Sequence, residues 1–268
     1  ETAGWDGFFI CDHLLLDPDG MLPLSDPSIV LGAVAAVTNK IIIGAMVTPV
    51  SRRRPWKLAK EFSTLDQLSN GRLRIGVGLG GLEQEFSNFG EDPDMKMLAK
   101  KTDEGLAIME QLHLGEVVNF DGEIYQIEGA RLLPRPIQRP RIPVWVAAML
   151  PAKPGQRRAA RWDGIMPQVM PVMVNESQDI SNLDMRVIME PSPEQIREVL
   201  EFTSPLRNTD DPFDVVVSAI SYGLDKAAVN EKLQSFQDAG TTWWLEWLEC
   251  GRPDSLADVR EQIMAGPP

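Results

Sequence analysis

The sequence predicts an α/β protein of the (β/α)8 barrel class, in which parallel strands alternate with helices. Seven short apolar runs have strand character, and a helix or a helix-length connection separates each from the next, apart from one hairpin. The chain has 268 residues, which lies within the range of one-domain barrels and predicts a single domain over residues 1–268. A barrel closes with eight strands, so we expect the first strand and most of the first helix upstream of Glu1. An open doubly wound sheet, which needs no further strand, is the alternative.

In the first half of the chain, helix-boundary residues separate the apolar runs. Asp26-Pro27 opens one helix. Pro55 suits the first turn of the next, whose apolar residues recur at helical spacing up to Leu68, and Asn70-Gly71 ends it. The pattern predicts strands at residues 6–13 and 41–47, a strand that runs into glycines at 71–81, and helices at 26–38, 55–68 and 97–114.

In the second half, a hairpin interrupts the alternation. Asp121-Gly122 stands between two short runs, and we interpret residues 117–128 as a β-hairpin insertion. Residues 170–191 show no clean period and are interpreted as a loop or lid. A further helix begins at Ser192-Pro193. The remaining prediction is of strands at 142–148, 163–169, 215–220 and 242–248, and of helices at 155–162, 226–239 and 255–264.

The composition favours a protein that binds small organic molecules. A formal charge of -13 repels phosphate backbones, so we expect no nucleic-acid partner. No apolar run approaches the roughly eighteen residues of a membrane span, so we expect no membrane association. Cys11 and Cys250 lie far apart in a chain with no secretory leader, which predicts free thiols and a cytoplasmic location. Paired Cys or His spacing is missing, so no metal site is expected.

Barrels of this class bind ligands at the carboxyl ends of their strands, which makes the residues there the functional candidates. His13 ends the first apolar run, and its imidazole titrates near neutrality, so it is our candidate for contact with cofactor or substrate. A satisfied structural histidine is the alternative. His113 ends a helix and is assigned no role.

Charged residues follow other strands. Arg52, Arg53, Arg54 and Lys57 predict either an anion site for phosphate or carboxylate, or a solvated loop paired with nearby acids. Free backbone N–H groups at residues 155–158, where a helix opens, suit a phosphate. The glutamates that follow the glycine strand, Glu83 and Glu85, are interpreted as solvated loop residues, with acids in the site as the alternative.

The glycine cluster at residues 76–81 has two explanations. Without Cβ atoms, Gly76, Gly78, Gly80 and Gly81 let the backbone approach a flat or phosphorylated ligand. Equally, they relieve crowding inside a tightly packed barrel.

A series of motifs extends over nearly the whole chain. They are residues 4–9 (GWDGFF) with Asp12-His13, 55–61 (PWKLAKE), 64–73 (TLDQLSNGRL), 76–81 (GVGLGG) with Glu85, 120–125 (FDGEIY), 134–138 (PRPIQ) and 159–164 (AARWDG). In this order they resemble the bacterial luciferase-like monooxygenase family, whose members hold FMN or the deazaflavin coenzyme F420 in an eight-stranded barrel. Members are often dimers, so a homodimer is one expectation.

The resemblance implies an oxidoreductase that transfers hydride or activates oxygen on a small organic substrate through FMN or, alternatively, F420. The ring would lie against the strand at 41–48, where the family often has a non-prolyl cis bond, here near Ala45-Met46. The phosphate would lie beside the strand end at 147–148 and the turn at 155–158. His13 would be the catalytic residue, as a proton donor or acceptor. Implied cofactor contacts are Ala45, Met46, Thr48, Gly78, Gly80, Ala147, Ala148, Gly155, Gln156 and Arg157.

Two departures from the family pattern affect the substrate. Deazaflavin sugar-phosphate dehydrogenases carry a tryptophan shortly after the histidine and a glutamate after the second glycine pair. This chain has Leu14–Asp17 and Gly81 there. The departures argue against a sugar phosphate and leave the acid partner of His13 unidentified. A non-catalytic flavin-binding relative or subunit, and a metal-independent barrel lyase acting on a phosphorylated substrate, are the alternative functions.

Overall fold

The computed structural model describes residues 1–16, 23–169, 190–248 and 255–268. The chain divides into two compact units, and each is described by itself. The first unit consists of Glu1 and Asp6–Val144, and the second of Thr2–Trp5 and Trp145–Pro268. Most of the segment interpreted as a lid, and Cys250, lie outside the described residues.

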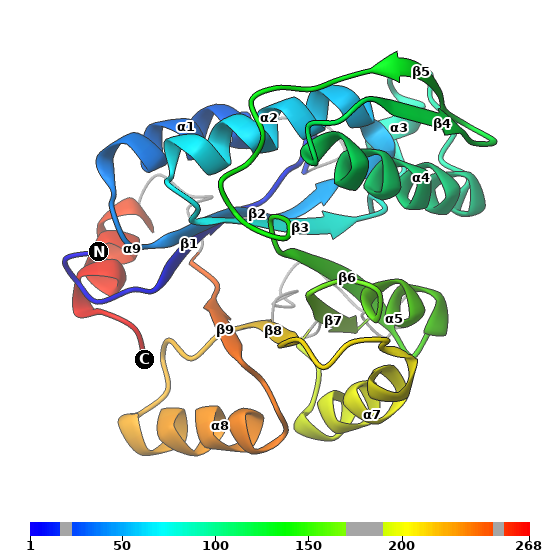
Figure 1. Ribbon diagram of the computed structural model, residues 1–268. Coiled ribbons are helices and arrows are strands. Elements are labelled where there is room, and N and C mark those ends of the chain that lie inside the picture. Colours follow the sequence, from blue (N-terminus) through cyan, green and yellow to red (C-terminus); the bar gives the residue numbers. More distant parts are fainter. Residues whose placement is uncertain (17–22, 170–189, 249–254) are drawn as a thin grey trace. The chain divides into compact units, whose positions relative to one another are not determined.

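The first unit contains three neighbouring parallel strands, β1 (Gly7–Ile10), β2 (Ile42–Pro49) and β3 (Leu73–Gly78). In register, Gly7 pairs with Ile42, and Ile43 pairs with Leu73. Its described helical segments are α1 (Pro27–Val37), the 3-10 turn η1 (Val50–Arg52), α2 (Pro55–Leu68), α3 (Gln84–Ser87) and α4 (Met95–His113). Helices α1 and α2 lie over one face of the strands (Figure 1).

Local chemistry explains where these helices begin and end. The Asp26 side chain accepts the Ile29 N–H and caps α1, and Pro55 begins α2 as predicted. The end of α1 is held by Arg72, which is only 8% exposed. Its guanidinium donates to the carbonyl oxygens of Ala35 and Thr38 at 3.1 and 2.9 Å, so orphan carbonyls at the end of the helix are satisfied.

The predicted hairpin forms. Strands β4 (Val118–Asp121) and β5 (Gln126–Ala130) pair antiparallel around the Asp121-Gly122 turn. The Glu104 carboxylate on α4 accepts hydrogen bonds from the backbone N–H groups of residues 123, 124 and 125. A Cβ at Gly122 would lie 2.3 Å from Glu104 Oε2, so a side chain there would displace Glu104 from its present position. Whether the hairpin is an insertion into a barrel stays a prediction.

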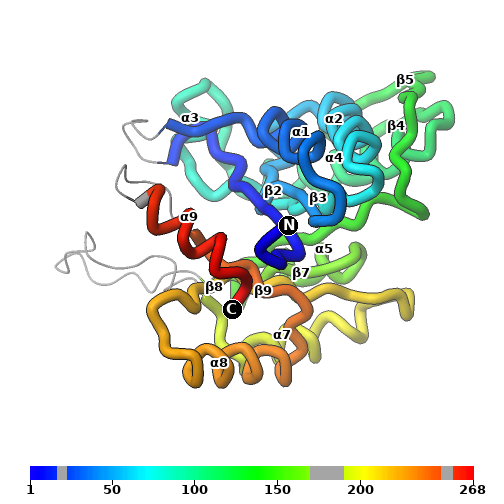
Figure 2. The backbone as a smooth tube through the Cα atoms, turned by 90° about the vertical axis from the view of Figure 1, so that its left-hand side faces the viewer, coloured from blue at the N-terminus to red at the C-terminus, as the bar shows by residue number. Residues whose placement is uncertain are grey.

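The second unit contains four parallel strands in the order β6 (Val144–Leu150), β7 (Gly164–Val169), β8 (Asp214–Ala219) and β9 (Trp243–Glu246); the first residue of β6 belongs to the first unit. Its described helical segments are α5 (Lys153–Ala159), α7 (Pro193–Thr203), the 3-10 turn η3 (Ser204–Leu206), α8 (Lys226–Asp238) and α9 (Ser255–Ala265). Ser192 and Gln195 form a capping box that starts α7 at the predicted residue. Figure 2 shows the N-terminal segment beside α9, where Trp5 Nε1 donates to the Ile263 carbonyl at 2.8 Å.

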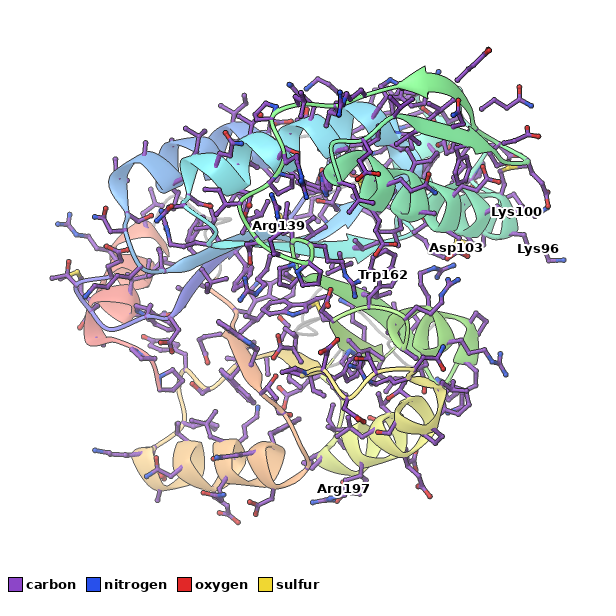
Figure 3. All side chains as sticks on the ribbon, viewed as in Figure 1. Lys96, Lys100, Asp103, Arg139, Trp162 and Arg197 are labelled. Carbon is purple, nitrogen blue, oxygen red and sulfur yellow. The ribbon has the colours of Figure 1, made fainter. Side chains whose placement is uncertain are left out.

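Parallel strands alternating with helices confirm the predicted α/β class in each unit. Closure into an eight-stranded barrel stays a prediction. The strands carry the buried core, with Ile43 and Val77 fully buried in the first unit and Trp145 and Val216 in the second. Charged side chains such as Lys100 project away from the strands (Figure 3). No described helix combines the length and the apolar character that a membrane crossing requires.

Candidate functional site

Charged side chains gather where the three strands of the first unit end. Asp12 and His13 follow β1, Arg52 belongs to the turn after β2, and Glu85 lies on α3 after β3. Parallel strands place their carboxyl ends at one edge of a sheet, so these segments meet although up to 72 residues separate them. His13, the arginine-bearing turn and Glu85, which follows the glycine strand, therefore converge at one edge of the sheet. We call Asp12, His13, Arg52, Arg53 and Glu85 the strand-end cluster.

His13 is held by a buried carboxylate. Its Nδ1 lies 3.2 Å from Glu85 Oε2, and the imidazole is 28% exposed while the Glu85 side chain is 0% exposed. Because an ionised carboxylate only accepts hydrogen bonds, the proton of a neutral His13 is on Nδ1. Nε2 then carries the lone pair, and no hydrogen bond to Nε2 forms within the described part of the chain. The arrangement presents a fixed, reachable proton acceptor.

Glu85 has further partners besides His13. The backbone N–H groups of Leu14 and Leu15 donate to its Oε1. Arg52 Nη1 lies 2.8 Å from the same oxygen, an ion pair that lacks hydrogen-bond geometry. With this many partners, the carboxylate is fixed in position. Glu85 therefore acts as the orienting group of His13.

Asp12 completes the cluster. It is 2% exposed, and Arg52 Nη2 and Arg53 Nη2 lie 2.8 and 2.9 Å from its carboxylate oxygens. Two carboxylates and two guanidinium groups balance in charge, which is how buried charges are tolerated. For Arg52 and Arg53, therefore, pairing with acids is the explanation that holds, rather than an open anion site.

The interpretation of Glu85 as a solvated loop residue is wrong, whereas Glu83 is exposed as expected. Glu85 is also the acid partner of His13 that the sequence left unidentified. One signal pointed to it and to Asp12. Adjacent arginines at a strand end of an acidic protein require nearby carboxylates, and acids at neighbouring strand ends are among those in reach.

On β2, the predicted ring-contacting residues are partly buried. Ala45 is 6% and Thr48 2% exposed, and Met46 is intermediate. The peptide bond between Met46 and Val47 is cis, one residue beyond the expected position. The register with β3 shifts between Ala45 and Thr48. Contact of these residues with a cofactor stays a prediction.

Packing explains two of the glycines. A Cβ at Gly78 would lie 2.6 Å from Val47, and one at Gly80 would lie 2.6 Å from the Phe86 ring. Gly80 also has a φ of +97°. The crowding explanation therefore applies to both, and their contact with a cofactor stays a prediction. Gly81 differs, because a Cβ there would meet no atom within 4 Å.

The phosphate-side candidates belong to the second unit. Ala148 is buried and Ala147 intermediate on β6, and a Cβ at Gly155 would lie 3.0 Å from Ala148 Cα, so glycine lets α5 approach the strand. Gln156 is 1% exposed and donates to the Ala152 carbonyl at 3.1 Å. Arg157 is exposed, 5.7 Å from the Phe202 ring. Phosphate binding by these residues stays a prediction.

The second histidine has a buried, structural position. His113 is 7% exposed at the end of α4, and its Nε2 lies 3.0 Å from the Ala59 carbonyl oxygen of α2. Burial lowers the pKa of His113 below its ordinary value of 6.5, despite the hydrogen bond to Ala59 and the charge of Asp66. A neutral ring that donates Nε2–H to the carbonyl fits both observations.

Known proteins share the sequence and the fold. The family model described as luciferase-like monooxygenase matches residues 1–179. An F420-dependent glucose-6-phosphate dehydrogenase of Microbacterium testaceum is 34% identical over 57% of this chain and 45% of its own length. The chain thus spans about half the length of such curated relatives.

Solved structures share the fold at low identity. The coenzyme F420 dependent tetrahydromethanopterin reductase of Methanopyrus kandleri has a TM-score of 0.65 at 17% identity, over 91% of this chain and 85% of its own. The oxygenating constituent of 3,6-diketocamphane monooxygenase from Pseudomonas putida, solved with FMN, has a TM-score of 0.61 at 18% identity, over 82% of this chain and 58% of its own. With its first 179 residues matched by the family model, the chain belongs to the luciferase-like monooxygenase family.

Proposed function

We propose that this protein is a cytoplasmic oxidoreductase that acts on a small organic substrate through bound F420 or FMN, with His13 as the proton-handling residue. One observation carries the proposal, namely the imidazole of His13 held at the strand ends by buried Glu85. A histidine locked by a carboxylate on one nitrogen, with the other nitrogen reachable, is the usual form of a general base.

Features of the first unit fit a flat heterocycle. Open space lies next to Gly81, where a side chain would meet no atom within 4 Å, and the imidazole edge of His13 is partly exposed. The strand-end cluster is balanced in charge, so a neutral ring system would meet no net charge. In this proposal Ala45, Met46 and Thr48 line the ring.

The chain's own contribution to the chemistry is control of one proton. When bound, F420 or FMN would supply the hydride-accepting or oxygen-activating chemistry. Oxidation of an alcohol also releases the hydroxyl proton, and His13 Nε2 is the group placed to accept it. Arg52 and the backbone amides that hold Glu85 keep that carboxylate in its orienting position. General acid–base assistance of this kind contributes about 10²–10⁴-fold in rate.

Between the two cofactors, we favour F420. The name of the relative from Microbacterium testaceum specifies F420, and that protein is 34% identical to this chain over the matched residues. A proton acceptor is also required by alcohol oxidation, whereas oxygen activation does not call for one at this position. Leu14–Leu16 and Gly81 replace the tryptophan and glutamate of the sugar-phosphate dehydrogenases, so we propose an alcohol or carbonyl substrate without a sugar phosphate.

The wider architecture is proposed on the same grounds. We infer a single-domain (β/α)8 barrel, with the hairpin as an insertion and the phosphate near residues 147–148 and 155–157. We also propose a homodimer, because members of the family are often dimers.

Titration of the purified protein with F420 and with FMN, followed by cofactor fluorescence, tests the proposal. We expect saturable 1:1 binding that is tighter for F420, and cofactor reduction by one member of a panel of alcohols. Binding with no reduction across the panel would favour a non-catalytic relative. Failure of both cofactors to bind would contradict the proposal and favour the lyase alternative.

A further inference from the structure

A recess of the first unit is lined in part by residues of the arginine-bearing turn. It has a volume of about 390 Å³, within the range of small-molecule sites. Elements that line it are the turn before α2, the start of α4 and the loop before β5. The lining side chains used below are Arg54, Glu91, Asp92, Lys101, Ile124 and Tyr125. We call this recess the Arg54 pocket.

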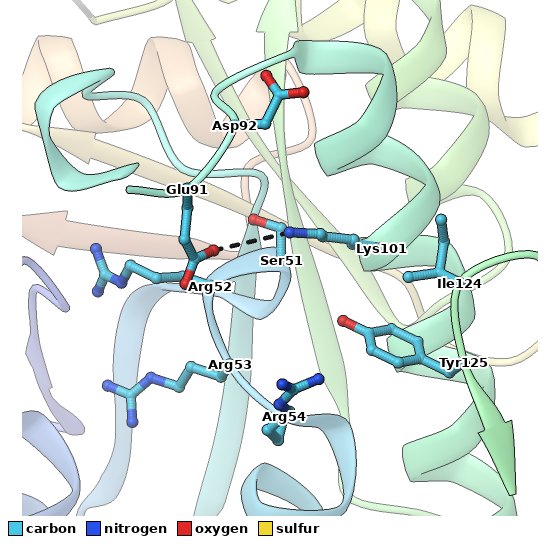
Figure 4. Close-up of a pocket in the computed structure, with 9 residues that line it drawn as sticks. All are labelled: Ser51, Arg52, Arg53, Arg54, Glu91, Asp92, Lys101, Ile124 and Tyr125. Atoms are coloured by element: carbon cyan, nitrogen blue, oxygen red, sulfur yellow. Dashed lines mark ion pairs between the residues drawn. The ribbon is translucent and has the colours of Figure 1, made fainter. Parts of the chain in front are cut away.

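The three consecutive arginines, residues 52–54, have different interaction partners. Arg52 and Arg53 direct their guanidinium groups to Asp12 in the strand-end cluster. Arg54 lies on the pocket side, and within the described chain no carboxylate comes within ion-pair distance of it. Its guanidinium carbon is 5.9 Å from the Trp56 ring centroid, a position compatible with stacking that leaves the N–H donors available. Figure 4 shows Arg54 turned toward Tyr125 and the other two arginines turned away.

Tyr125 adds a neutral donor to the same pocket. The residue is 7% exposed, and its ring meets Trp56 edge-on with centroids 6.1 Å apart. Glu104 fixes the backbone by accepting the Tyr125 N–H at 3.0 Å. Burial raises the pKa of the Tyr125 phenol, so the hydroxyl stays protonated at neutral pH. No hydrogen bond engages this hydroxyl within the described residues, and its oxygen is not among the fully buried polar atoms, so it is available to a ligand.

Lys101 is a third donor in this pocket, and its interaction with Glu91 is weak. Lys101 Nζ lies 3.7 Å from Glu91 Oε2, beyond hydrogen-bond distance, and Glu91 is 44% exposed. Glu91 and Asp92 line the same pocket, so the charges of Arg54 and Lys101 are offset by two carboxylates. This balance disfavours polyanions. It allows a ligand whose single anionic group replaces Glu91 beside Lys101.

We propose that the Arg54 pocket binds a small organic oxyanion, a carboxylate or a phosphate monoester, which Arg54 and Lys101 contact with their charges and Tyr125 with its hydroxyl. The guanidinium fork matches two oxygens of either group. Ile124 and the Tyr125 ring offer apolar contact to the organic part of the ligand. Arg52 and Arg53 also line the pocket, but their guanidinium groups pair with Asp12, and the proposed oxyanion contacts involve neither His13 nor the cofactor.

Calorimetric titration of the full chain with benzoate and with phenyl phosphate tests this inference and separates the two sources of oxyanion. We expect saturable binding of one of them to the wild type. Arg54→Gln should weaken that binding about tenfold or more, because it removes a charge-assisted contact to the oxyanion. Lys57→Gln is the matched control. Lys57 lies three residues after Arg54, and its side chain is 68% exposed and paired with Glu61. Its replacement also removes one positive charge but should leave the affinity for the oxyanion unchanged.

Two further variants isolate the other donors. Tyr125→Phe removes only the hydroxyl and should weaken binding severalfold, while Glu91→Gln removes the competing carboxylate and should strengthen it. Equal losses in Arg54→Gln and Lys57→Gln would indicate non-specific attraction and overturn the proposal. Absence of binding by both probes would also overturn it. Neither result bears on F420 or FMN binding, which depends on other residues.

Discussion

At the scale of single residues, the proposed function depends on one carboxylate, that of Glu85, which has several partners besides His13. Glu85 is 1% exposed and accepts from the backbone amides of Leu14 and Leu15 while it contacts His13 and Arg52. Truncation to Ala would leave a buried guanidinium without this partner, at a cost of about 3–5 kcal/mol. The informative change is therefore Gln, which keeps the size and one accepting oxygen.

We expect Glu85→Gln to fold and to lower turnover about tenfold or more, because the amide no longer fixes the proton of His13 on Nδ1. The pH dependence of kcat should shift as well, which a merely structural role would not cause. Glu83→Gln, on the same short segment but exposed, is the control and should behave as the wild type. Identical pH profiles for the two variants would remove Glu85 from the mechanism.

At the scale of elements, the sequence predicted the starts of some helices correctly, because residues next to each of these starts determine it. Helix α2 starts at Pro55 and α7 follows Ser192, as expected, since caps and first-turn prolines act within a few residues. The burial of Glu85 could not be predicted in the same way, because it depends on β1 and β2 bringing His13 and Arg52 beside it. Helix α3, of four residues, is also too short to show a helical period.

The packing of α4 on α2 carries a pH dependence. Burial lowers the pKa of His113, so the unfolded chain binds a proton more readily than the folded one. The contribution of His113 to stability is therefore complete above its ordinary pKa of 6.5 and is lost as the pH falls below that value. We expect the free energy of unfolding to fall between about pH 7.5 and about pH 5.5, more in the wild type than in His113→Gln, which keeps an N–H donor near Ala59. Parallel curves from urea denaturation would contradict this assignment.

At the scale of the whole molecule, both units repeat one theme of parallel strands and helices, and family membership connects them to F420 and FMN enzymes. The charge of -13 is spread over the chain, yet the strand-end cluster pairs Asp12 and Glu85 with Arg52 and Arg53. The resemblance identified the family from the sequence alone. Substrate specificity was less predictable, because Leu14–Asp17 and Gly81 depart from the pattern that the resemblance implies for sugar-phosphate dehydrogenases.

The central claim is that His13 moves a proton while a bound cofactor carries out the redox step. The direct test compares wild type and His13→Ala in F420 affinity and in the rate of anaerobic F420 reduction by the substrate found in the panel, after both proteins show equal thermal unfolding. We predict dissociation constants within about twofold and a rate lowered about 10²–10⁴-fold in His13→Ala. An unchanged rate in His13→Ala would contradict the account.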